Sequence, residues 1–102
     1  MKAKILIIDG DLRNCLNLKR VLVQNNFEVA IENDGIRGLN KILTQDYDFC
    51  ILETRLHLKT GFSVVTEIRK VNSVIPIFFI SPFFYFFITI FAEFLSRKHY
   101  IF

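Results

Sequence analysis

The sequence predicts an α/β fold in which a parallel sheet is covered by helices on both faces. Short, continuous apolar runs recur along the chain, as expected of strands that are buried on both faces of a sheet. Between these runs lie longer segments whose apolar residues return at helical spacing. Alternation of strand and helix is typical of parallel sheets, because a crossover helix joins each strand to the next.

The first strand is expected at residues 5–8, which form an uninterrupted apolar run. It ends in a polar turn at residues 9–11, which can cap the following helix. That helix is expected to end at Asn25 and Asn26. Its inward face is expected to consist of Leu12, Cys15, Leu16, Val21 and Leu22.

The second strand is expected at residues 27–32, where apolar and polar residues alternate as in a half-exposed strand. A turn at residues 33–35 precedes a second helix. The inward face of this helix is expected to consist of Ile36, Leu39, Ile42 and Leu43. Residues 49–52 form a third, buried strand that ends at Glu53.

A polar loop leads to Gly61, where a third helix is expected to begin. Its inward face is expected to consist of Phe62, Val65, Ile68 and Val71. A fourth buried strand follows Pro76 at residues 77–80 and ends at Ser81. We therefore expect one α/β domain over residues 1–82.

Composition narrows the classes of function. The 102 residues suffice for one hydrophobic core, and 52% hydrophobic against 23% charged residues argues against disorder. The net charge of +3 is modest and its basic residues are spread out, so we expect no nucleic-acid binding by this chain alone. Cys15 and Cys50 lie in apolar runs without metal-ligand spacing, as in reduced cytoplasmic proteins.

Polar side chains follow three of the predicted strands. Asp9 and Asp11 come after the first, Glu53 after the third and Ser81 after the fourth. If the strand order is 2-1-3-4, these ends converge on one crevice at the carboxyl edge of the sheet. Carboxylate oxygens suit a hard cation such as magnesium. Asp11 also has an alternative interpretation as the cap of the first helix.

Residues 4–9, 46–53 and 75–81, together with Gly61, resemble the framework of bacterial response-regulator receiver domains. The resemblance covers residues 2 to about 82. It implies a flavodoxin-like, doubly wound parallel sheet with strand order 2-1-3-4-5, in which we expect strand 5 to be reduced or missing. It also implies a role in two-component phosphorelay signalling, with a sensor kinase or a downstream protein as partner.

The resemblance further assigns roles to individual residues. Glu53 occupies the position of the phospho-accepting aspartate, and Asp9 that of the first acid of a metal-binding pair. Ser81 and Tyr100 match the hydroxyl and aromatic residues of the family's switch. Arg55, two residues after Glu53, has no role in the resemblance but is a candidate cation for the pocket.

Three departures weaken the phosphorylation chemistry. Glu53 stands in place of the accepting aspartate and moves the carboxylate outward by about 1 Å. Gly10 replaces the second acid of the pair, and the expected lysine would fall one residue past Phe102. We therefore expect weak Mg2+ binding at best and no other cofactor. The predicted function is a receiver-like module, not an enzyme, that binds a protein partner without being phosphorylated. An acceptor with relaxed site chemistry is the first alternative.

Residues 83–102 form a divergent apolar segment, and no charged side chain occurs between Val71 and Ala92. We expect a fourth helix followed by a stub of a fifth strand, or a tail without a selected structure. A membrane span is disfavoured because only residues 83–92 are unexplained by the receiver pattern, too few to cross a bilayer. A small membrane-associated protein or a truncated gene product stays as an alternative. The apolar segment also predicts self-association.

Overall fold

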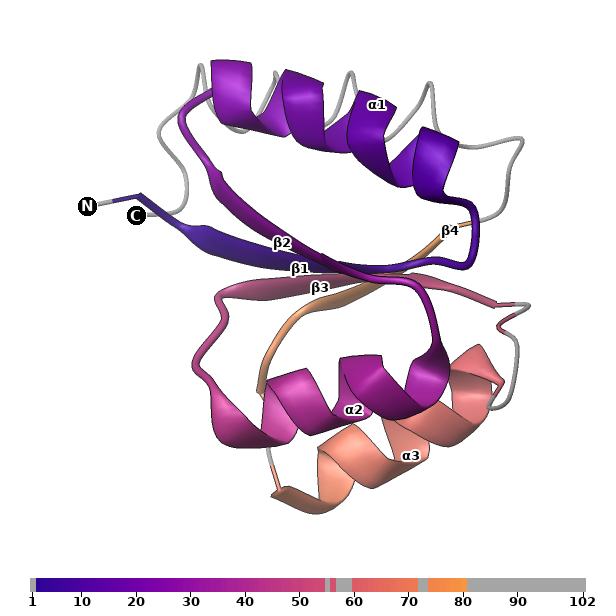
Figure 1. Ribbon diagram of the computed structural model, residues 1–102. Coiled ribbons are helices and arrows are strands. Elements are labelled where there is room, and N and C mark those ends of the chain that lie inside the picture. Colours follow the sequence, from indigo (N-terminus) through magenta and orange to yellow (C-terminus); the bar gives the residue numbers. More distant parts are fainter. Residues whose placement is uncertain (1, 55, 57–59, 72–73, 81–102) are drawn as a thin grey trace.

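The computed structural model describes residues 2–54, 56, 60–71 and 74–80, and these form a parallel sheet between two layers of helices (Figure 1). The strand order is β2-β1-β3-β4, which confirms the predicted order. Helix α1 covers one face of the sheet, while α2 and α3 cover the other (Figure 1). In chain order the elements are β1 (Lys4–Ile8), α1 (Leu12–Gln24), β2 (Glu28–Glu32), α2 (Gly35–Thr44), β3 (Phe49–Glu53), α3 (Gly61–Val71) and β4 (Ile77–Ile80).

The register brings the carboxyl ends of the strands level with one another. Ile8, the last residue of β1, pairs with Glu32 on one side and with Leu52 on the other. Glu53 in turn pairs with Ile80. Since all four strands are parallel, their polar ends meet at one edge of the sheet.

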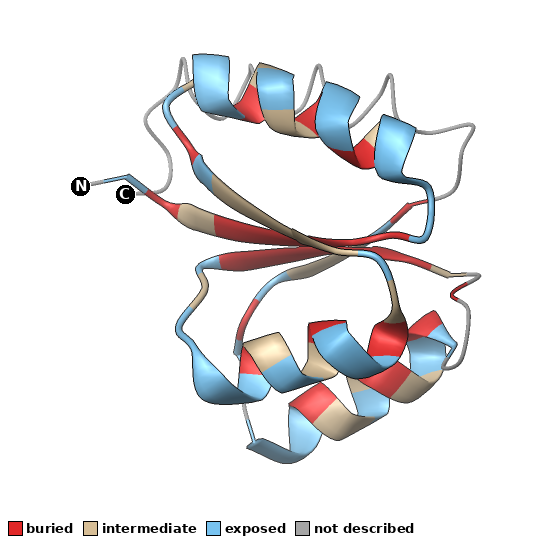
Figure 2. Cartoon of the chain, viewed as in Figure 1, coloured by how far each residue is buried: buried red, intermediate tan, exposed pale blue. Residues whose placement is uncertain are grey.

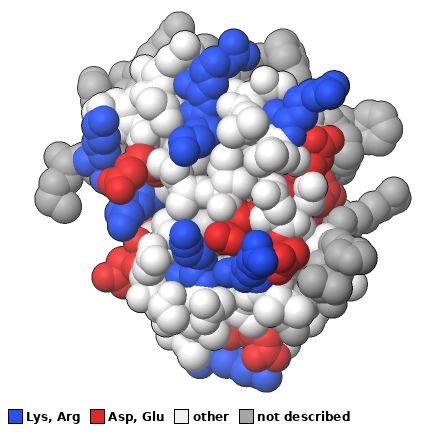
Figure 3. Space-filling model, in the orientation of Figure 1, with Lys and Arg blue, Asp and Glu red and all other residues white. Residues whose placement is uncertain are grey.

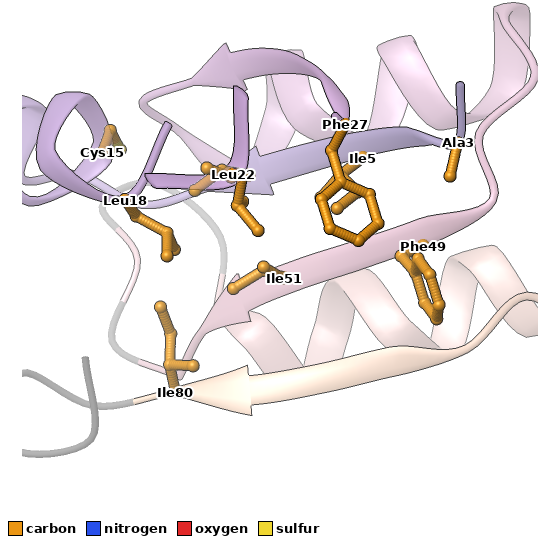
Figure 4. Packing of buried hydrophobic residues seen from close by; sticks show 10 residues of the cluster. Ala3, Ile5, Cys15, Leu18, Leu22, Phe27, Phe49, Ile51 and Ile80 are labelled. Carbon is orange, nitrogen blue, oxygen red and sulfur yellow. The ribbon is translucent and has the colours of Figure 1, made fainter. Parts of the chain in front are cut away.

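Each of the two faces of the sheet has its own hydrophobic layer. The layer under α1 joins Ile5, Ile7 and Ile51 to the helix residues Cys15, Leu18 and Leu22 (Figure 4). The layer under α2 and α3 includes Leu6, Ile8, Cys50, Leu52, Val64 and Ile68. Burial on both faces is why the central strands are continuous apolar runs (Figure 2).

The predicted inward faces of the helices were partly wrong. Leu12 and Leu16 of α1 are 52% and 53% exposed, and Phe62 of α3 is 65% exposed. The other apolar residues predicted inward but found exposed are Ile36, Leu43 and Val71. The buried residues are Cys15, Leu18 and Leu22 in α1, Gly35, Gly38 and Ile42 in α2, and Gly61, Val64 and Ile68 in α3.

All three helices therefore meet the sheet through the same spacing of i, i+3 and i+7. In α2 and α3 this contact includes glycine, because the helix backbone comes close to the sheet. A Cβ atom at Gly38 would lie 2.6 Å from Cδ1 of Ile8, and one at Gly61 would lie 2.6 Å from the main-chain oxygen of Glu53. Glycine carries no hydrophobic signal, so the periodic pattern pointed to neighbouring apolar residues instead.

Side chains cap the first turn of each helix. Asp11 accepts a hydrogen bond from the Asn14 N–H, and Asp34 accepts one from the Arg37 N–H. The hydroxyl of Thr60 accepts one from the Ser63 N–H at the start of α3. These bonds satisfy amide groups that have no partner within the helix.

Several predictions concern residues outside those that the structure describes. They are the roles of Arg55, Ser81 and Tyr100, and the division of the chain at residues 82 and 83. Within residues 2–54, 56, 60–71 and 74–80, no helix has the length and apolar character needed to span a membrane.

We predict that Gly61→Ala lowers the free energy of unfolding by about 1–3 kcal/mol, because the added methyl group meets main-chain atoms of Glu53 and Thr54 that cannot move aside cheaply. Urea denaturation measures this change. Gly10→Ala is the matched control: its Cβ would meet only the main-chain oxygen of Asn33, at 3.6 Å, so it should change stability by less than about 1 kcal/mol. Equal effects of the two changes would contradict the close packing of α3.

Candidate functional site

Two buried acids lie at the carboxyl edge of the sheet, at the ends of neighbouring strands. Asp9 follows Ile8, Glu53 follows Leu52, and Ile8 and Leu52 are paired in register. Asp9 is 3% exposed and Glu53 6% exposed, and in the described part of the chain no other charged side chain is buried. The structure thus brings together the first acid of the predicted pair and the residue at the predicted acceptor position.

Asp9 is held in a position that leaves one carboxylate oxygen for a ligand. Its Oδ1 accepts a hydrogen bond of 2.9 Å from the Asp11 N–H. Its Oδ2 is buried and has no hydrogen-bond partner among the described residues. Burial raises the pKa of Asp9 from 3.8 to about 6; the Asp11 N–H opposes this rise, whereas the charges of Glu53 and Asp11 add to it.

The main chain of Asp9 is fixed from both sides. Its N–H donates to the main-chain oxygen of Glu32 at 3.0 Å. Its carbonyl oxygen accepts from Nδ2 of Asn33 at 2.9 Å and from Sγ of Cys15 at 3.4 Å. Residue 9 is therefore connected to β2, to the loop after β2 and to α1.

Glu53 lies where β3 approaches the first residue of α3. Its Oε1 accepts a hydrogen bond of 3.2 Å from the Thr54 hydroxyl. The Gly61 N–H donates to the main-chain oxygen of Thr54 at 3.3 Å. The absence of a side chain at Gly61 lets α3 begin directly against this strand end, which helps to exclude water from Glu53.

The Asp11 side chain is not buried with this pair, although the Asp11 N–H bonds to Asp9. This side chain is exposed, and its Oδ1 accepts from the Asn14 N–H at 3.2 Å as the cap of α1. This contact matches the interpretation of Asp11 as a helix cap. Its role as a metal ligand stays a prediction.

The donor set fits a hard cation that is held by few protein ligands. Mg2+ in proteins is commonly bound by one or two carboxylates and several waters. Oδ2 of Asp9 and the Glu53 carboxylate supply oxygen donors of this kind. Within the residues that the structure describes, no group of three His, Cys, Asp or Glu side chains could hold a metal ion. Gly10 adds no side-chain donor, although only the main-chain oxygen of Asn33 lies near a Cβ atom at its position.

Sequence reasoning missed the contribution of Asn33 and treated Cys15 only as core. Cys15 is indeed a free, buried cysteine, and burial raises the pKa of its thiol to about 12, so the thiolate is not formed near neutral pH. Its hydrogen bond to Asp9 adds a second role. The signal for Asn33 was its place directly after Glu32, which pairs with Ile8 next to the site.

Comparison with known proteins gives a consistent result. The family model described as "Response regulator receiver domain" matches residues 5–84. The chain is 36% identical over 76 residues to Sensor protein EvgS of Escherichia coli strain K12, covering 74% of this chain and 6% of EvgS. It is 34% identical over 77 residues to Response regulator ArlR of Staphylococcus epidermidis, covering 76% of this chain and 35% of ArlR. The chain therefore spans about a third or less of these relatives.

Solved structures agree in fold. The receiver domain of the Francisella response regulator 1452 superimposes with a TM-score of 0.80 at 18% identity, covering 96% of this chain and 99% of that one. The receiver domain of histidine kinase PA1611 of Pseudomonas aeruginosa PAO1, described with a magnesium ion coordinated in the active site cleft, gives 0.76 at 24% identity over 79% and 68%. A structure of histidine kinase ThkA in complex with response regulator protein TrrA gives 0.74 at 28% identity over 80% and 70%.

The raised pKa of Asp9 predicts a pH-dependent stability. Between about pH 4 and pH 6 the folded chain binds more protons than the unfolded chain, so the free energy of unfolding falls as the pH rises. Above pH 6 the loss in the free energy of unfolding that ionised Asp9 causes reaches its full value, about 3 kcal/mol for a pKa shift of this size. Asp9→Asn should therefore stabilise the chain at pH 7 and make it less sensitive to pH in this window. Urea denaturation at pH 4, 5, 6 and 7 compares the two proteins, and parallel pH profiles would contradict the assignment.

We also predict that Gly10→Asp strengthens Mg2+ binding, which we expect to be roughly millimolar at best in the wild-type chain. The substitution restores a carboxylate at an open position next to Asp9. Isothermal titration measures the change, expected to be about tenfold or more since affinity for hard cations follows the number of charged ligands. The control, Gly10→Asn, has a similar shape but no charge. Equal affinities of both variants would show that residue 10 does not face the cation.

Proposed function

Because this chain belongs to the response regulator receiver domain family, we propose that it is a receiver-type module of two-component signalling that binds a protein partner without being phosphorylated. The observation that carries the proposal is that a buried glutamate occupies the position of the phospho-accepting aspartate. Glu53 stands there with a buried side chain, level with Asp9.

Glutamate places the carboxylate about 1 Å farther from the strand than aspartate does. A displacement of this size can slow a reaction that needs in-line geometry by about a hundredfold. Burial adds to the obstacle, because a side chain that is 6% exposed offers little approach to a phosphodonor. Glu53 instead supplies a fixed carboxylate where a receiver would carry a phosphoryl group, although with less charge and fewer oxygens.

Only Asp9 is present of the expected pair of metal-binding acids, and this weakens the expected binding of magnesium. A bound magnesium ion would neutralise charge on a transferring phosphoryl group. Asp9 and Glu53 are the residues whose side chains would hold it, and Gly10 contributes no side-chain ligand. The raised pKa of Asp9 means that a proton competes with the cation as the pH falls toward 6.

The surface of α1 supports binding of a protein partner. Leu12, Leu16 and Val23 lie along one side of the helix, and each is about half exposed. The charged residues of α1 are Arg13, Lys19 and Arg20, all of them basic; Lys and Arg side chains stand over this helix in Figure 3. We propose that this mixed apolar and basic surface meets a partner with an apolar centre and an acidic rim, such as a sensor kinase or a downstream protein.

The remaining parts of the proposal follow from the family. We propose that the module is cytoplasmic, has no catalytic activity of its own and does not bind nucleic acid. A second candidate function is phosphoryl acceptance with relaxed chemistry, and it is favoured by the buried Oδ2 of Asp9, which has no hydrogen-bond partner in the described part of the chain. Self-association is an additional proposal, supported by the exposed apolar side chains of α1.

We predict that the wild-type chain forms no stable acyl phosphate when it is incubated with a small phosphodonor and Mg2+. Glu53→Asp alone should not restore acceptance efficiently, because it corrects the reach of the carboxylate but adds no metal ligand. Intact-mass measurement detects the added phosphate, with an ordinary receiver domain treated in parallel as the positive control. A phosphate on the wild-type chain that disappears in Glu53→Ala would overturn the proposal in favour of the second candidate.

A further inference from the structure

The main-chain carbonyl of Asp9 receives hydrogen bonds from two side chains that belong to different parts of the fold. Nδ2 of Asn33 donates from the loop after β2, and Sγ of Cys15 donates from α1. The two donors are also in contact with each other, since Nδ2 of Asn33 lies 3.8 Å from Sγ of Cys15. The turn between β1 and α1 is thus hydrogen-bonded to α1 and to the loop after β2, and both bonds are made at the buried Asp9.

These contacts determine how Asp9 is oriented. With its N–H bonded to Glu32 and its carbonyl bonded to Asn33, residue 9 has both main-chain groups fixed. The orientation of the carbonyl sets the plane of the following peptide, and therefore the path of the chain to Asp11. The Asp11 N–H is the donor that holds Oδ1 of Asp9 and leaves Oδ2 buried without a partner among the described residues.

In the described part of the chain, the Asn33 side chain makes no hydrogen bond within its own turn. The cap of α2 is the neighbouring Asp34, which accepts from the Arg37 N–H. The amide of Asn33 instead reaches a carbonyl 24 positions away in the sequence. A polar side chain used in this way acts on the site and not on its own turn.

We propose that Asn33 is a positioning residue of this site: by holding the Asp9 carbonyl it directs the Asp9 carboxylate and so sets the affinity of the site for a divalent cation. This role does not depend on whether the chain is phosphorylated. Residues that orient a metal ligand through a hydrogen bond commonly change metal affinity by about 10- to 100-fold when they are replaced. Because Asn33 acts through the main chain, the lower end of that range is expected.

The metal-free test uses Asn33→Ala with Asn40→Ala as the matched control, since Asn40 is an exposed residue of α2 away from Asp9. In 1H–15N spectra of the wild-type chain, the Asp11 amide proton should be shifted downfield by its bond to the Asp9 carboxylate. Asn33→Ala should move this signal upfield and leave α2, α3 and β4 unchanged, and Asn40→Ala should not move it. An unchanged Asp11 signal would overturn the proposal, and so would a spectrum that changes throughout the chain, which would indicate a general structural role.

The second arm measures Mg2+ affinity by titration in the Gly10→Asp background and in the wild-type background. Adding Asn33→Ala should raise the dissociation constant about tenfold. Adding Asn40→Ala should leave it unchanged. An Asp11 signal that moves while the dissociation constant stays the same in both backgrounds would overturn the link to the cation. Neither arm involves phosphoryl transfer, so failure here is distinct from failure of the proposed function.

Discussion

The burial of two carboxylates at the ends of adjacent strands is the constraint on which the rest of this structure depends. Asp9 and Glu53 are level because β1 and β3 are paired in register, and both are almost fully removed from water. Removing an acid from water disfavours its charged form, and the neighbouring charge adds to the cost. The surrounding contacts partly compensate: the Asp11 N–H bonds to Asp9, and the Thr54 hydroxyl bonds to Glu53.

The strands themselves were predictable from the sequence, whereas their order, on which the convergence of their ends depends, was predicted from the resemblance to receiver domains. Runs such as residues 5–8 and 49–52 are buried on both faces, so their continuous apolar character identifies them without knowledge of the partner strands. The helix faces were less predictable. Gly38 and Gly61 lie where the helices come close to the sheet. Because glycine has no side chain, it does not contribute to the hydrophobic periodicity from which the inward helix faces were predicted.

In the candidate site, too, some residues were predictable from the sequence and others were not. Asp9 and Glu53 were found because they directly follow buried strands, a property that the sequence displays. Asn33 was not found, since its importance lies in a bond to a residue 24 positions away, which only the register of β1 and β2 creates. Asp11 was ambiguous for a different reason. An aspartate after a strand and before a helix suits either a ligand or a cap, and its bond to the Asn14 N–H is visible only in three dimensions.

The surroundings of position 10 have a consequence for how this site can be altered. Only the main-chain oxygen of Asn33 lies within contact distance of a Cβ atom there, at 3.6 Å, so no side chain obstructs the first carbon of a larger residue. Where a lost group is replaced by new packing, its return is blocked by collisions and the change becomes difficult to reverse. Here no such barrier has formed around the glycine. As far as the surroundings of the Cβ atom are concerned, an acid could therefore be introduced at position 10 without displacing a neighbouring side chain.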